Sequence, residues 1–153
     1  MNVSEVLEAL RNTLAADADI KTFCQAKYAK NPKIFLGVSD DYPPTKDDYP
    51  VIAIFHVLRS SRGDSQRFIT YQALIGVGVL KETIDTSVNG QVTLPGLVEV
   101  ERLRELVESA IFGKVGHKQD VNGETATEVL FPLFRSDTII NLEFLRTHGN
   151  SMK

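Results

Sequence analysis

The clearest candidate for ion chemistry is a loop that repeats Asp-Asp-Tyr-Pro at residues 40–43 and 47–50. Paired carboxylates in a flexible segment suit Ca²⁺ or Mg²⁺, and a divalent-ion site here would use Asp40, Asp41, Asp47 and Asp48. The spacing fits no calcium-binding loop, and no glycine stands at the turn that such a loop needs. Aspartates also cap turns and prolines stiffen exposed chain, so we favour a solvated loop without metal.

Residues that commonly act as nucleophiles or ligands are scattered. His56, His117 and His148 do not pair at ligand spacing. Cys24 is the only cysteine, which excludes an intrachain disulfide and a thiolate cluster, and its apolar helical setting predicts a core residue. His56 interrupts an apolar strand and is expected in the core or an interface. We therefore predict no catalytic residue, no metal and no cofactor.

Three arginines, Arg59, Arg62 and Arg67, lie in a polar segment between two predicted strands. On a hairpin tip they could contact an acidic partner or DNA passing close by. A solvated tip without a partner is the simpler interpretation, and both remain open.

The totals describe an ordinary soluble domain. The chain has 153 residues, of which 42% are hydrophobic and 24% charged, and its formal net charge is −3. This length supports one domain over 1–153, with frayed ends at 1–2 and 147–153. The acidic balance argues against a general nucleic-acid binder, and no apolar run is long enough for a membrane span. The amino terminus lacks the layout of a signal peptide, so synthesis in the cytoplasm is expected.

Periodicity predicts the elements that hold these residues. The longest signal is a strand from Phe68 to Leu80, in which every second residue is apolar or aromatic. A strand of thirteen residues is about twice the ordinary length, so it bends at Gly76 or Gly78 or projects to meet another chain. Residues 51–58 form a preceding strand covered on both faces, and the two make a long hairpin.

Helices are predicted from residue 3 to about 16, from 18 to about 30 and from Pro95 to Gly113. Short strands are expected at 33–38, in a flap at 84–88 and 91–94, at 127–134 where Pro132 demotes the strand to an edge or bulge, and at 138–146. Residues 114–126 are expected to be a polar loop, and the charged residues of the third helix, Glu99 included, to lie mostly in water. The fold class is therefore α+β: a mixed, mainly antiparallel sheet with a long hairpin and helices on one face.

The order of these elements resembles a known family. A helical pair leads through a Tyr-Pro loop into Tyr49-Pro50-Val51-Ile52-Ala53-Ile54, followed by a long hairpin, an amphipathic helix and the closing strand Asp137-Thr138-Ile139-Ile140-Asn141-Leu142-Glu143-Phe144. Over about residues 3–146 this layout is similar to the tail terminator and minor tail proteins of tailed phages and prophages, including Mu-like ones. The resemblance rests on the order and general character of these elements and not on a diagnostic motif.

The resemblance implies a structural virion protein without an active site. Members of that family form hexameric rings that cap the tail tube, stop its polymerisation and present a surface to the head-completion protein. On this basis we expect a homo-oligomer, a tube contact through Arg59, Arg62 and Arg67, a passing contact with DNA in the lumen, no membrane partner, and assembly into a virion or tail-like particle. A ring interface is expected along the long strand and the flap, with Phe68, Thr70, Gln72, Leu74 and Leu80 on the strand.

Two other classes of function remain. One is a small adaptor or binding module, monomeric or dimeric and without enzymatic activity. The other is a small enzyme whose active residues meet only in the fold, which a deep pocket holding His56 and carboxylates of perturbed pKa would favour.

Overall fold

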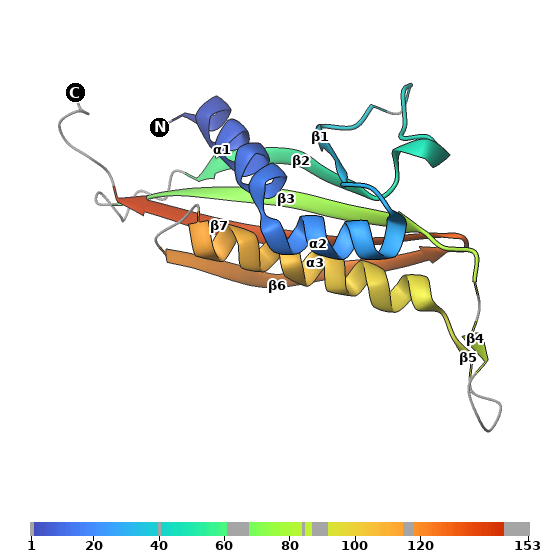
Figure 1. Ribbon diagram of the computed structural model, residues 1–153. Helices are drawn as coiled ribbons and strands as arrows, with labels where there is room; N and C mark the ends of the chain where they lie inside the picture. Colours follow the sequence, from blue (N-terminus) through green and yellow to red (C-terminus); the bar gives the residue numbers. More distant parts are fainter. Residues whose placement is uncertain are drawn as a thin grey trace.

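A long twisted sheet with helices on one face forms the body of the protein (Figure 1). This computed structural model describes residues 2–39, 41–60, 68–83, 85–86, 92–114 and 118–145. Three α-helices and a mixed, mostly antiparallel five-stranded sheet make up the described part, which confirms the predicted α+β class.

Each of the two amino-terminal helices begins directly after a capping residue. Helix α1 spans Val3–Ala16, and Asn2 caps it by accepting the Glu5 backbone N–H at 2.9 Å while Glu5 accepts the Asn2 N–H. Asn2 and Glu5 therefore form a capping box at the start of the helix. Asp17 closes α1 and caps α2, Ala18–Tyr28, by accepting the Ile20 N–H. The apolar stripe of α1 packs on the sheet, mainly against β2.

The sheet has the strand order β1-β2-β3-β7-β6. Strand β1, Lys33–Leu36, runs parallel to β2, Val51–Ser60, and all other neighbours are antiparallel. Strand β3, Phe68–Leu80, has the predicted bounds and occupies the centre. It pairs without a register shift with β7, Leu133–Leu145, along its entire length.

That pairing answers the question raised by the length of β3. Both edges of the strand are hydrogen-bonded, so neither edge of the strand is free to pair with another chain. The glycines cause no irregularity in its pairing with β7, and the one shift in its pairing with β2 lies on β2, between Ile54 and His56. Alternate residues of β3 face the helices as predicted: Tyr71, Ala73 and Ile75 are fully buried there.

Helix α3, Pro95–Lys114, supplies the other half of the core. Its apolar stripe is fully or almost fully buried against β3 and β7, and consists of Val100, Leu103, Val107, Ala110 and Ile111. The flap is a pair of two-residue strands, β4 at Asp85–Thr86 and β5 at Val92–Thr93, which project beyond the sheet (Figure 1). No helix of the described part is long and apolar enough to span a membrane.

Glu99 corrects the prediction that the charged residues of α3 face water. Its side chain is buried. It accepts a hydrogen bond from Tyr28 Oη at 2.8 Å and forms an ion pair with Lys81 Nζ at 3.4 Å. Helix periodicity places Glu99 beside the apolar stripe, and only the packing of α2 and of the β3 end over it supplies these partners.

Residues 114–126 correct the prediction of a polar loop. Most of this segment belongs to β6, Lys118–Leu130, which pairs with β7 from Lys118↔Glu143 to Leu130↔Leu133, with a shift between Val121 and Thr125. The 127–134 run is accordingly the end of β6, a turn at Phe131 and Pro132, and the start of β7. Strand β6 lies at an edge of the sheet, whereas Pro132 lies in the turn that joins β6 to β7.

Candidate binding cleft

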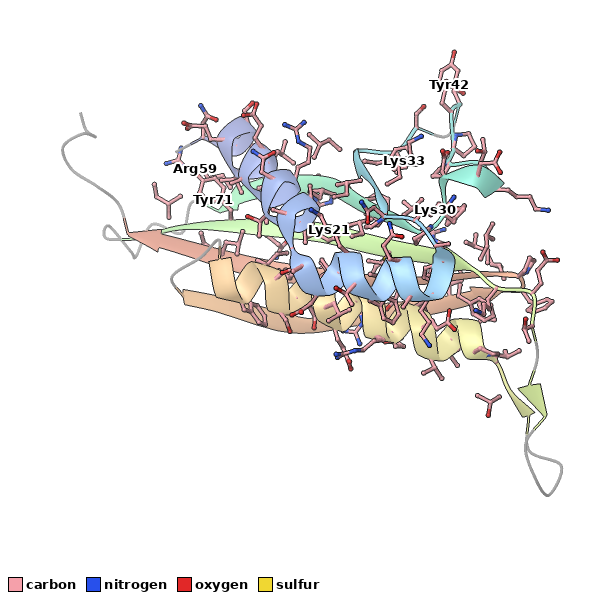
Figure 2. All side chains as sticks on the ribbon, viewed as in Figure 1. Lys21, Lys30, Lys33, Tyr42, Arg59 and Tyr71 are labelled. Carbon is pink, nitrogen blue, oxygen red and sulfur yellow. The ribbon has the colours of Figure 1, made fainter. Side chains whose placement is uncertain are left out.

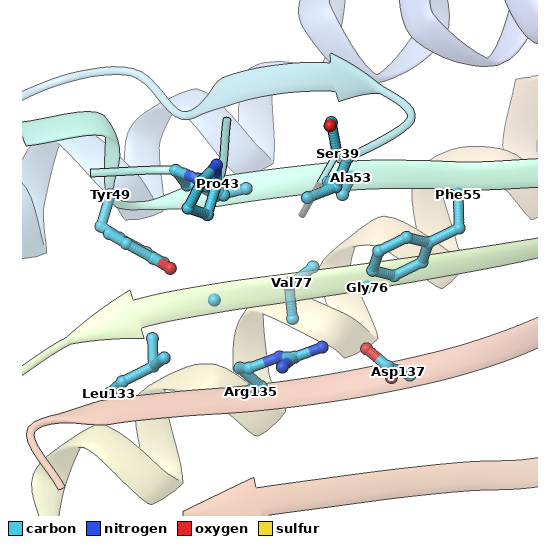
Figure 3. Close-up of a pocket in the computed structure, with 14 residues that line it drawn as sticks. Ser39, Pro43, Tyr49, Ala53, Phe55, Gly76, Val77, Leu133, Arg135 and Asp137 are labelled. Atoms are coloured by element: carbon cyan, nitrogen blue, oxygen red, sulfur yellow. The ribbon is translucent and has the colours of Figure 1, made fainter. Parts of the chain in front are cut away.

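A cleft of about 570 Å³ lies on the face of the sheet opposite the helices, which we call the open face. Three strands and one loop form it: β2, β3, β7 and the segment between β1 and β2 (Figure 3). Its lining is mainly apolar, with Tyr49 and Phe55 as aromatic walls and Arg135 and Asp137 as its charged groups. These residues are far apart in the sequence and meet only because β2, β3 and β7 are neighbours.

Two glycines of β3 make the floor of the cleft. A Cβ atom on Gly76 would stand 2.4 Å from Asp137 Oδ1 and 2.6 Å from Phe55 Cε2, and one on Gly78 would stand 2.9 Å from Tyr49 Cε1. The side chains of the walls therefore lie directly on bare backbone, in space that any larger residue would fill. Glycine at these positions serves close approach and not bending.

A bulge on β2 supplies one of the aromatic walls. Ile54 pairs with Ile75 and His56 pairs with Leu74, so Phe55 is the extra residue between them. A bulge re-aims the side chain it carries. Phe55 points into the cleft over Gly76 (Figure 3).

The loop before β2 forms the opposite wall. Asp48 accepts the Thr45 N–H at 2.8 Å and pairs with Lys33 Nζ at 3.0 Å, which ties the short 3₁₀ turn Lys46–Asp48 to β1. The Thr45 hydrogen bond, aided by Lys33, holds the pKa of Asp48 below its usual range. Tyr49 follows directly, and burial raises the pKa of its phenol.

Arg135 and Asp137 stand two residues apart on β7 and lie side by side in the cleft (Figure 3). Arg135 Nη1 is 3.5 Å from Glu128 Oε1 on the neighbouring strand. Asp137 Oδ1 is buried and has no hydrogen-bond partner among the described residues. Burial raises the pKa of this carboxyl, and the positive charge of Arg135 opposes the rise only in part.

The four aspartates of the divalent-ion hypothesis do not form a cluster in the described residues. Asp40 lies outside them, Asp41 is exposed, Asp47 accepts Lys30 Nζ through its backbone oxygen, and Asp48 serves as the cap described above. Within the described ranges no three His, Cys, Asp or Glu side chains converge as ligands. The described part of the loop is held by the Thr45–Asp48 hydrogen bond and by contacts from Lys30 and Lys33.

The structure confirms the prediction for Cys24 and corrects the one for His56. Cys24 is fully buried, as predicted, and burial raises the pKa of its thiol to about 12. The expectation of a core position for His56 is wrong, because its side chain is exposed: beyond the bulge β2 alternates between the covered face and the open face. Likewise the prediction that β2 is covered on both faces holds only for its first half. His117 and His148 lie outside the described residues.

Arg59 is exposed near the start of α1 (Figure 2), whereas Arg62 and Arg67 lie outside the described residues. The residues expected at a ring interface fall on the open face, where Thr70, Gln72, Leu74 and Leu80 are half-buried. Gln72 Nε2 donates to Asn141 Oδ1 of β7 at 3.5 Å. For Phe68 only the backbone is described.

The cleft itself is the site that the sequence prediction missed. The available signal was the pair Gly76 and Gly78 on one face of an otherwise bulky strand, which indicates close approach by other side chains. The described lining offers aromatic surface, one carboxylate and one guanidinium, an arrangement suited to binding. No protein-family model and no curated protein matches this sequence.

Proposed function

We propose that the protein is a structural component of a phage or prophage tail, a terminator that assembles into a ring, caps the tail tube and joins it to the head-completion protein. The observation that carries this proposal is the open face of the sheet. Strands β2, β3 and β7 present apolar side chains on this face, and no helix of the described part covers them.

The two faces of the sheet differ sharply. On the covered face Tyr71, Ile75 and Ile140 are fully buried. On the open face Leu58 is 54% exposed and Leu74 and Ile139 are half-buried. An antiparallel sheet can leave one face in water, but the wet face then usually carries polar residues. Apolar residues of this size on the open face favour a surface that another protein covers.

The form of β3 restricts how such a contact is made. Because both edges of β3 are paired, a second copy must meet its face and not extend the sheet from it. Thr70, Gln72, Leu74 and Leu80 lie on that face and remain our proposed interface. A ring built this way joins one patch of each copy to a different patch of the next.

A second candidate function is an adaptor or binding module that works as a monomer or dimer. The cleft favours it, since aromatic walls beside paired polar groups are typical of ligand sites. Both functions agree in requiring no catalysis.

Light scattering behind a sizing column tests the ring directly, with and without isolated tail tubes. We expect a mass near six times the 17.0 kDa of one chain and tubes that stop growing when the protein is added. Leu74→Asp should abolish both, because a charge would then be buried at the contact. Val98→Asp is the matched control, since Val98 is 59% exposed on α3.

A monomer that neither forms rings nor caps tubes, even at high concentration, would end the terminator proposal and favour the adaptor. Normal rings and capping by Leu74→Asp would remove the open face from the interface. The triple variant Arg59→Ala, Arg62→Ala, Arg67→Ala tests the tube contact: rings should persist at high concentration while capping weakens.

A further inference from the structure

The two outer strands of the sheet each have one edge that no other strand of the described part pairs with. In the order β1-β2-β3-β7-β6 these strands are β1 and β6, which lie on opposite sides of the sheet (Figure 1). A free edge carries a row of backbone N–H and C=O groups that can bond to another strand. The edges therefore differ from the open face, because the partner that they can accept is an extended chain.

The free edge of β1 follows from the hydrogen bonds on its inner side. Lys33 and Gly37 donate their N–H groups to the backbone oxygens of Pro50 at 2.9 Å and Ile54 at 2.8 Å. Successive N–H groups of a strand point to opposite edges, so the N–H group of Leu36 points away from β2. Proline and charged residues, which commonly block such an edge, are absent from positions 34–36 of the sequence.

The free edge of β6 is regular over the second half of the strand. The pairing with β7 shifts between Val121 and Thr125 and then continues without a shift to Leu130. An irregularity of this kind protects an edge from pairing with another chain. Beyond it, the side chains from Ala126 to Leu130 are all exposed, and Glu128 is the one charged residue among them.

Exposed apolar side chains gather on these two strands. Of the nine large apolar side chains exposed in the described part, five lie on β1 or β6 or within two residues of them. They are Leu36 and Val38 on one side of the sheet and Val129, Leu130 and Phe131 on the other. Apolar residues that cluster on a surface favour a contact with another protein, whereas single scattered ones do not.

The two edges also run in opposite directions. Strand β1 is parallel to β2, and each of the next three pairings is antiparallel, so β6 runs antiparallel to β1. When two copies stand side by side in the same orientation, β6 of one copy meets β1 of the next as an antiparallel pair. The helices of both copies then lie on the same face of one continuous sheet. The edges are thus complementary to each other in direction and in apolar character.

We propose that β6 of one copy pairs with β1 of a second copy, so that the sheet continues from copy to copy. The contact joins two different edges, and such a head-to-tail contact closes a ring when the rotation per copy allows it. The inference goes beyond the proposed function. It concerns self-association through the sheet edges, requires no role in a tail, and leaves the open face accessible.

Crosslinking identifies which edges meet. Leu36→Cys and Leu130→Cys are prepared as separate proteins, one of them labelled with heavy nitrogen, and are mixed and treated with a short bismaleimide. We expect the product that joins the two variants to exceed both products that join like variants. The natural protein is the blank, because its one cysteine, Cys24, is fully buried. A dominant product between like variants would show a two-fold contact and overturn the inference.

Leu36→Pro tests the backbone hydrogen bonds of the contact. Because the N–H group of Leu36 points outward, proline there removes no hydrogen bond to β2 but blocks the edge. Leu36→Thr is the matched control, since it also removes the apolar side chain and keeps the N–H group. In sedimentation velocity we expect Leu36→Pro to associate at least about tenfold more weakly than Leu36→Thr. Thermal unfolding checks that both variants are folded.

Each further outcome decides between the contact and the proposed function. Equal association of Leu36→Pro and Leu36→Thr overturns the inference, and so does a natural protein that stays monomeric at high concentration without forming the mixed crosslink. Rings of Leu36→Pro that cap tubes normally also overturn it, while leaving the proposed terminator intact. Association that depends on the edges, without any capping of tubes, would uphold the inference and remove the proposed function.

Discussion

Tyr28 donates a hydrogen bond of 2.8 Å from its phenol to Glu99 Oε1, and this contact joins the end of α2 to the first turns of α3. Burial, followed by the hydrogen bond to Glu99, raises the pKa of Tyr28. Lys81 completes the group, pairing with Glu99 at 3.4 Å and standing 5.9 Å above the Tyr28 ring. Three elements thus meet at one buried carboxylate.

Tyr28→Phe should destabilise the fold by about 1–3 kcal/mol, because Glu99 loses a donor in a buried position. Urea unfolding followed by circular dichroism measures the change. Tyr42→Phe is the control, since Tyr42 is 83% exposed and projects from its loop (Figure 2), and its effect should stay within about 0.5 kcal/mol. Equal effects of the two substitutions would show that the Tyr28 hydroxyl contributes nothing.

Arg104 links α3 to the sheet through two carboxylates. It binds Glu101 at 2.7 Å and Glu108 at 2.9 Å, and these accept hydrogen bonds from Ser136 and Thr138 of β7. Arg104→Ala should cost about 1–3 kcal/mol in the free energy of unfolding, because both carboxylates lose their cation.

Arg102 provides the matched comparison on the same helix. Its side chain is 57% exposed and only 3.5 Å from Glu105. Exposed pairs of this kind contribute about 0–1 kcal/mol, so Arg102→Ala should have little effect in the same unfolding assay. A loss for Arg102→Ala as large as that for Arg104→Ala would contradict the role assigned to the half-buried Arg104 and its two carboxylates.

The raised pKa of Asp137 should make the free energy of unfolding depend on pH. Burial raises its folded pKa above the usual 3.8, so its contribution is most favourable below that value and is lost as pH rises through the folded pKa. The monomeric Asp137→Asn variant should therefore be more stable than the natural protein at pH 7, and the difference should shrink toward pH 4. Unfolding curves across this range measure it, with the exposed Asp41→Asn as control. A natural protein that is more stable at pH 7 would mean that Asp137 has an internal cation.

Cys24 should resist alkylation in the folded protein. Its pKa of about 12, against 9.0 for a free thiol, lowers the thiolate fraction about a thousandfold, and the side chain is fully buried. Intact-mass analysis after iodoacetamide at pH 8 should find the native protein unmodified and the guanidinium-unfolded protein fully modified. Rapid labelling of the native chain would show that α2 opens from the core.

Local sequence determined most of the elements. Alternation of apolar residues set the bounds of β3, because one face of that strand is buried under helices. Helices were predicted from residue 3 and from residue 18, and Asn2 and Asp17 cap them there, since a helix needs side-chain acceptors for its first N–H groups. The range of α3 and the flap were likewise predicted, because periodicity and turn residues are properties of short segments.

Tertiary structure alone decided the remainder. Strand β6 has no alternating pattern at its start and becomes a strand because β7 offers it a partner. Glu99 is buried because Tyr28 and Lys81 reach it from distant elements, and the bulge at Phe55 appears only in the pairing with β3. The cleft exists only in the folded sheet, because the strand order brings Tyr49, Gly76 and Asp137 together. Asp137 Oδ1 has no hydrogen-bond donor among the described residues because of the neighbours that the fold brings to it.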